Sequence, residues 1–159
     1  RMIDDSRYPE RLGVCFDTCH VFAAGYDLRT EDDYHQTFEK FDQVIGLDRL
    51  LAFHLNDAKS EFHSRVDRHQ HIGQGHIGIT PFQLLVNDPR FSAVPMIIET
   101  PQMDTMHGQN LKVLRIERSI AENTPTPRET LFKIPRASQR PYGENIKKSI
   151  FLIRFFRTL

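Results

Sequence analysis

Three short apolar runs alternate along the chain with longer segments whose apolar residues recur at helical spacing. Each run is nearly continuous in apolar side chains, which is typical of strands covered on both faces in a parallel sheet. The runs lie at residues 12–17, 50–56 and 95–99. The longer segments carry amphipathic stripes and predict helices. These helices cover about 31–46, 80–86 and 108–122. The pattern therefore predicts three strand–helix units of an α/β fold.

Residue types that bind metals stand at or beside the ends of these runs. The six candidate ligands are Asp17, His20, His54, Asp67, His69 and Glu99. Asp67 and His69 are two residues apart, so they would face the same side of an extended chain. Carboxylates and imidazoles together suit zinc or manganese. Short apolar strands that end in such residues are typical of a parallel barrel that binds metal at its carboxyl-terminal rim. We expect one metal site.

Four segments, in order and with similar spacing, resemble endonuclease IV, the zinc-dependent family that cleaves DNA at abasic sites. They cover residues 13–30, 53–60, 64–78 and 97–101. The resemblance runs from about Gly13 to about Arg115 and corresponds to the C-terminal part of a family member. The sequence departs from the family pattern at His63, where we expect a glycine.

The resemblance implies up to three zinc ions in a complete family member. It assigns one ion to His20, Asp67 and His69. It assigns most of a second ion to Asp17, His54 and Glu99. Glu99 would also act in catalysis by orienting the nucleophile. The third ion and a bridging glutamate would come from the N-terminal half of the barrel, which this chain lacks.

The activity implied by the resemblance is hydrolysis of the phosphodiester bond 5′ to an abasic site in double-stranded DNA, a step of base excision repair. Two alternatives stay open. One is a barrel sugar isomerase or epimerase, which also builds metal sites from Asp, His and Glu. The other is an inactive fragment that binds zinc. The pair Asp67 and His69, with the long loop around it, favours the nuclease.

Length limits the architecture. A complete (β/α)₈ barrel takes about 250 residues, whereas this chain has 159. We therefore expect a partial TIM barrel of about the last three βα units, formed by residues 1–117, with the missing N-terminal half as a partner. Because three strands cannot close a barrel, a strand edge should stay open. Residues 118–159 would be an irregular basic tail, either disordered or not native to the domain.

Composition indicates how charge is distributed along the chain and which cellular compartment to expect. Residues 1–117 carry 12 Lys/Arg and 18 Asp/Glu, whereas residues 118–159 carry 9 Lys/Arg and 3 Glu. The two cysteines, Cys15 and Cys19, make no disulfide framework, so we expect an intracellular protein, cytoplasmic or, in a eukaryote, nuclear or mitochondrial. An alternative interpretation of this pair is a Cys-x₃-Cys-His zinc knuckle. No apolar stretch is long enough for a membrane span.

Overall fold

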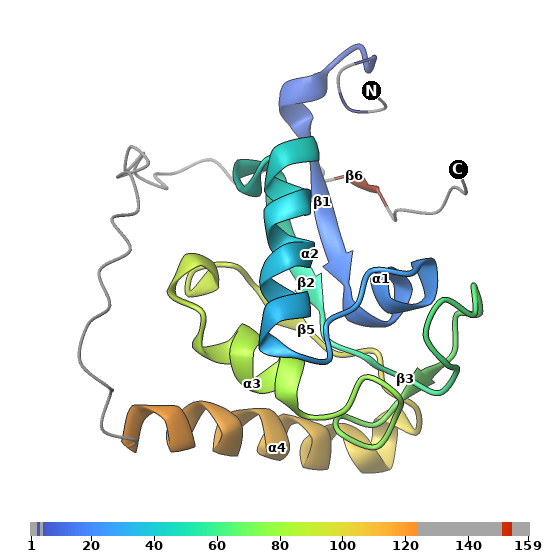
Figure 1. Ribbon diagram of the computed structural model, residues 1–159, viewed down its shortest axis with the longest axis vertical. Coiled ribbons are helices and arrows are strands. Elements are labelled where there is room, and N and C mark those ends of the chain that lie inside the picture. The colour runs from blue at the N-terminus through green and yellow to red at the C-terminus, as the bar shows by residue number, and fades with distance from the viewer. Residues whose placement is uncertain (1–2, 4, 124–150, 154–159) are drawn as a thin grey trace.

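The computed structural model describes residues 3, 5–123 and 151–153 of the chain (Figure 1). Its main sheet has the strand order β5-β2-β1-β6, and all neighbouring strands are parallel. These strands are β1 (Leu12–Asp17), β2 (Leu50–His54), β5 (Met96–Ile97) and β6 (Phe151–Ile153). A second sheet pairs β3 (Asp57–Ala58) with β4 (His69–Gln70) in antiparallel fashion. The parallel α/β architecture is the one that the apolar runs predict.

Four α-helices surround these strands within the described part of the chain. They are α1 (Thr18–Ala24), α2 (Glu31–Val44), α3 (Thr80–Asn87) and α4 (Met103–Asn123). Short 3₁₀ turns occupy Pro9–Arg11, Leu47–Arg49 and Pro89–Phe91. Figure 1 shows α2 lying alongside β1 and β2, with α4 running past α3 at one end of the molecule. None of the described helices is long and apolar enough to cross a membrane.

The helices over 31–46, 80–86 and 108–122 are found with small shifts of their ends, but two local predictions are wrong. The segment after the first strand is helix α1, because Asp17 caps it, and not only a loop. The third strand, expected over 95–99, is the two-residue β5. Pro95 directly precedes it and has no N–H to donate to the ladder, and the N–H of Glu99 bonds to the Asn56 side chain instead. The loop between β3 and β4 forms a hairpin that the apolar pattern does not indicate.

An aromatic cluster between the sheet and α2 forms the centre of the core. Phe16 of β1 stacks on Phe38 of α2, with ring centroids 4.8 Å apart. Phe53 of β2 and Phe91 complete the cluster, at 5.0 Å from each other. All four side chains are buried, and each contributes roughly 1.5–3 kcal/mol by leaving water. This packing fixes β1 and β2 side by side and thereby aligns their carboxyl-terminal ends.

The described part of the predicted tail consists of the end of α4 and strand β6. The domain boundary predicted at residue 117 falls within α4, which continues to Asn123. Strand β6 pairs in parallel with Leu12, Gly13 and Val14 of β1. Residues 124–150 and 154–159 lie outside the described residues, so the division into a domain and a tail stays a prediction.

Strand β5 ends the sheet, so its outer edge has no strand beside it among the described residues. The side chain of Ile97 on this edge is 50% exposed. Because an uncovered parallel edge is a template for pairing with another chain, we expect concentration-dependent association in sedimentation velocity. A lysine on an edge opposes such pairing, so Ile97→Lys should shift the protein towards monomer.

A matched control is Ile116→Lys, which adds the same charge at a 46%-exposed position on helix α4 and not on the edge strand. It should leave association unchanged. A wild-type protein that stays monomeric at all concentrations would contradict this expectation.

Candidate metal centre

Asp17 is the residue at which β1 ends and α1 begins. Its Oδ1 accepts hydrogen bonds from the backbone N–H groups of Cys19, at 2.9 Å, and His20, at 3.1 Å. This is an N-cap, which satisfies donors that the first turn of a helix leaves open. Burial by itself raises the pKa of Asp17, but a hydrogen bond with His54 and the nearby imidazoles of His20 and His69 outweigh it. The net pKa lies below its ordinary value, so the carboxylate is ionised at neutral pH.

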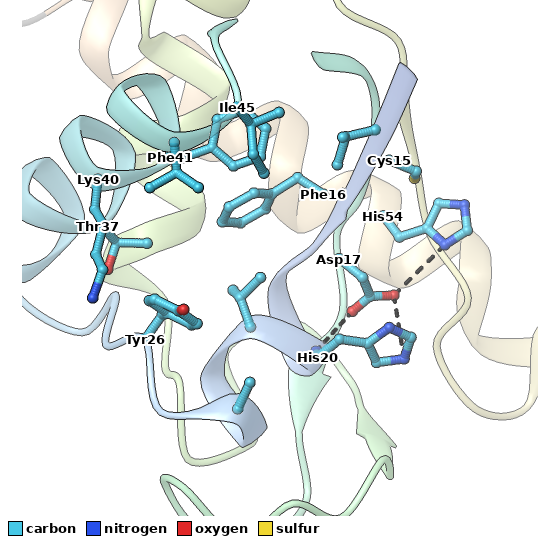
Figure 2. A pocket seen from close by; sticks show the side chains of 14 residues that line it. Cys15, Phe16, Asp17, His20, Tyr26, Thr37, Lys40, Phe41, Ile45 and His54 are labelled. Atoms are coloured by element: carbon cyan, nitrogen blue, oxygen red, sulfur yellow. Dashed lines mark hydrogen bonds and ion pairs between the residues drawn. The ribbon is translucent and has the colours of Figure 1, made fainter. Parts of the chain in front are cut away.

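The second oxygen of Asp17, Oδ2, lies among three imidazoles. It is 3.6 Å from His54 Nδ1, 3.8 Å from His20 Nε2 and 3.9 Å from His69 Nε2. Figure 2 shows the Asp17 carboxylate between His20 and His54. His54 Nδ1 also lies 2.9 Å from Glu99 Oε2. The ligand atoms of Asp17, His54 and Glu99 lie within 4.8 Å of one another, so they could hold one metal ion.

Asp67 joins the remaining two histidines. One carboxylate oxygen, Oδ2, is 3.0 Å from His20 Nε2, and the other, Oδ1, is 3.1 Å from His69 Nε2. The structure therefore brings together the three residues assigned to one ion by the resemblance. It also places Asp17 close enough to form a group with His20 and His69. Asp17 is thus common to both parts of the centre.

The backbone carbonyl of Glu99 fixes the tautomer of His69. His69 Nδ1 lies 3.0 Å from the Glu99 oxygen, and a carbonyl only accepts, so Nδ1 carries the proton. In the neutral ring, Nε2 then presents a lone pair. This atom is buried and forms no hydrogen bond within the described residues; it faces the Asp67 carboxylate instead. The Nε2 lone pair and the Asp67 oxygen, 3.1 Å apart, repel each other. A cation bound between them would turn this repulsion into attraction.

The spacing agrees with this interpretation. Tetrahedral zinc with ligands at about 2.0–2.1 Å separates the ligand atoms by roughly 3.3 Å. The contacts of Asp67 with His20 and His69, at 3.0 and 3.1 Å, are close to that separation. The imidazole and carboxylate donors are also those that zinc prefers. The residues present therefore fit a metal ion.

Asp57 anchors the loop that follows His69. This carboxylate is fully buried. Its Oδ1 accepts from the N–H groups of Ala58 at 2.8 Å and Ile77 at 3.0 Å, and its Oδ2 accepts from Gly75 at 3.0 Å. Burial raises the pKa of Asp57, although these N–H donors favour the ionised form. The metal-ligand pattern does not reveal this residue, because its carboxylate serves the backbone of the loop.

The zinc knuckle formed by Cys15 and Cys19 is not supported. Both are buried free cysteines, and none of the possible metal groups within the described residues contains the two together. Cys19 does lie near Asp67 and His69. Its Sγ, however, donates to the Arg68 carbonyl oxygen at 3.6 Å. Burial raises the pKa of the Cys19 thiol to about 12, so it stays protonated at neutral pH.

Two further histidines resolve questions that spacing alone leaves open. His71, two residues beyond His69, is buried and contacts Asn110 through Nδ1 at 3.1 Å, so it belongs to none of the possible metal groups described. His63, where a glycine is expected, has φ +59°. That left-handed conformation is one that glycine adopts without steric cost. The departure from the family pattern therefore falls on a position where the backbone conformation favours glycine.

Comparison with known proteins shows the family to which the fold belongs. Residues 1–117 match the family described as "Xylose isomerase-like TIM barrel". The chain belongs to this family, and the predicted partial TIM barrel is confirmed. Within it, the chain is similar to proteins named "Probable endonuclease 4". The relative from Geotalea daltonii is 54% identical over 116 residues, and that from Chloroflexus aggregans is 56% identical over 117. The predicted resemblance to endonuclease IV is thereby confirmed.

These relatives also give the extent of the match. Each of the two alignments covers 72% of this chain and 41% of the relative, so the chain spans about two-fifths of their length. Among solved structures, endonuclease IV from Thermus thermophilus superimposes with a TM-score of 0.65 at 37% identity. That match covers 75% of this chain and 42% of the other.

The close approach of Gly75 to Asp57 generates a stability prediction. A Cβ added to Gly75 would lie 2.5 Å from Asp57 Oδ1 and would also overlap the Ala58 carbonyl oxygen. Because backbone has to move to relieve this overlap, Gly75→Ala should destabilise the protein by about 1–3 kcal/mol. The measurement is the free energy of unfolding in urea.

Gly108 within α4 provides the control, because nothing lies within 4 Å of an added Cβ there. Gly108→Ala should raise stability by up to about 1 kcal/mol through helix propensity. Equal effects of the two substitutions would refute the role given to the Asp57–Gly75 contact.

Proposed function

We propose that this chain carries the zinc-binding part of an enzyme that hydrolyses DNA 5′ to abasic sites. The observation that carries the proposal is the convergence of all six candidate ligands around Asp17 Oδ2 and the Asp67 carboxylate. The relatives named endonuclease 4 give the reaction class. Because the chain spans about two-fifths of those relatives' length, we propose the activity for the complete enzyme and not for these residues alone.

Zinc, when bound, polarises phosphoryl oxygens and lowers the pKa of bound water towards 7. The chain's own residues would hold it in two ways. His20, Asp67 and His69 would hold one ion, and Asp17, His54 and Glu99 would contribute to a second. Glu99 is the most open of the latter group, with a side chain 36% exposed, so its carboxylate is accessible to substrate and water. The contacts of Asp67 with His20 and His69 support the first role, and the possible metal group of Asp17, His54 and Glu99 supports the second.

DNA as the substrate is consistent with the charge of the domain only when metal is included. Residues 1–117 carry six more acidic than basic side chains, 18 against 12, which opposes a polyanion. Divalent ions are often the largest local charges in a site and reverse its sign. The abasic nucleotide is also the easiest to expose, because it has already lost its base.

A sugar isomerase or epimerase stays the second candidate, and the description of the family as xylose isomerase-like is the observation that favours it. The names of the relatives favour the nuclease. The two reactions differ in what the metal centre must bind, a phosphodiester or the hydroxyl and carbonyl groups of a sugar. Turnover of an abasic-site oligonucleotide by the assembled protein distinguishes them.

We further propose that the remaining half of the barrel packs along β1. A cavity of about 130 Å³ lies beside this strand and is lined mainly by apolar side chains, among them Val14, Phe16 and Phe41. Figure 2 shows this apolar wall next to Asp17 and His20. Strand β6 pairs with residues 12–14 of β1, and the cavity begins where that pairing ends. A side chain from a strand or helix of the remaining barrel would fill it.

The zinc proposal predicts that His69→Ala lowers the metal content of the purified protein. The substitution removes a ligand whose buried Nε2 faces both Asp67 and Asp17. The measurement is zinc per chain by atomic spectroscopy after dialysis. His35→Ala is the control, since His35 is 58% exposed on α2. Equal zinc in the wild type and His69→Ala would contradict the assignment.

The incision prediction is that this chain alone cleaves abasic DNA poorly or not at all. The resemblance places a bridging glutamate and further ligands in a half that this chain does not include, so the activation of water is incomplete. The assay uses a duplex with one synthetic abasic site, and a full-length relative serves as the positive control. Efficient, chelator-sensitive cutting by the 159-residue chain would show the present ligands to be sufficient.

A further inference from the structure

Asn56 is a fully buried polar residue two positions beyond the end of β2. Its backbone is held by the hydroxyl of Thr18, which accepts from Asn56 N–H at 2.8 Å and donates to the Asn56 carbonyl at 2.6 Å. Thr18 is also fully buried. Two bonds to one short side chain leave the Asn56 backbone little freedom, so its amide group points in a defined direction.

The side-chain amide of Asn56 connects two candidate ligands that come from different strands. Its Nδ2 donates to Asp17 Oδ2 at 3.0 Å. Its Oδ1 accepts from the backbone N–H of Glu99 at 2.8 Å. The Asp17 oxygen is the one that faces the imidazoles, because the helix cap uses the other. Asn56 therefore orients the metal-facing atom of Asp17 and fixes the backbone of Glu99.

The connection continues to a third candidate ligand. The peptide units flanking Glu99 are held at both ends of the residue, by Asn56 at N–H and by His69 Nδ1 at the carbonyl. Displacement of Glu99 would therefore remove the acceptor that selects the His69 tautomer. Strand β5 ends at Ile97, two residues before Glu99, so the sheet ladder does not reach this position. The amide of Asn56 takes its place.

We infer that Asn56 is a positioning residue of the metal centre, which sets the Asp17 carboxylate and the Glu99 backbone in a common geometry. This inference rests on the proposed zinc function and adds a residue outside the ligand set. Partners that orient ligands in this way typically change metal affinity by about 10–100-fold when they are removed. Asn56 binds neither metal nor substrate in this role.

The test compares the wild-type chain with Asn56→Ala in two measurements. Zinc affinity is measured by competition with a chelating dye, and we expect about 10–100-fold weaker binding for Asn56→Ala. The tautomer of His69 is measured without metal, from long-range ¹H–¹⁵N correlations of its ring. The wild type should show the proton on Nδ1, and Asn56→Ala should show a mixture of tautomers.

Asn110→Ala is the matched control. Asn110 is also buried and bonds to His71, Ile72, Thr100 and Met106, none of which is a candidate ligand. It should lower the melting temperature yet leave zinc affinity and the His69 signals unchanged. If Asn56→Ala does not fold, Asn56→Ser, which keeps a polar side chain at this buried position, is measured in the same way.

The outcomes separate this inference from the proposed function. Unchanged zinc affinity in a folded Asn56 variant would overturn the positioning role, as would an equal loss in Asn110→Ala. If the wild type binds no zinc, the zinc proposal fails, and the metal-free ring signals decide on Asn56 alone. A His69 tautomer that is the same in all variants would then overturn its role, and a change confined to Asn56 would support it.

Discussion

The site depends on one constraint: the two oxygens of Asp17 make different contacts. One oxygen starts α1, and the other enters the cluster of imidazoles. The helix start, the strand end and the metal-facing charge are therefore fixed by a single buried carboxylate. Its low pKa, set by His54 and the neighbouring histidines against the effect of burial, keeps that charge present. Moving Asp17 would displace His20 as well, since His20 occupies the turn that Asp17 caps.

Much of this arrangement follows from local sequence. The runs ending at Asp17 and His54 predict two parallel strands, and parallel strands place their carboxyl ends at the same edge of a sheet. The pairing of Asp17 with His54 in the register of β1 and β2 agrees with that expectation. The two-residue spacing of Asp67 and His69 likewise places both on the same part of the centre. Their roles as ligands stay predictions that the zinc measurements address.

Other features lie beyond sequence patterns because they depend on contacts distant in the chain. Asn56 and Asp57 look alike as polar residues after a strand, yet one orients ligands and the other holds a loop. The sequence pattern does not predict helix α1, because an aspartate at position 17 is equally compatible with a strand end and with a helix cap. The pairing of β6 with β1 joins segments that are far apart in the sequence. No local periodicity contains that information.

The short length of β5 leaves Glu99 beyond the end of the sheet ladder. Asp17 and His54 are held within the sheet ladder, whereas the backbone of Glu99 stands beyond it and is held by side chains, those of Asn56 and His69. The placement of Glu99 therefore depends on the side chains of Asn56 and His69, so a substitution at either residue would reach the metal centre without altering a strand of the main sheet.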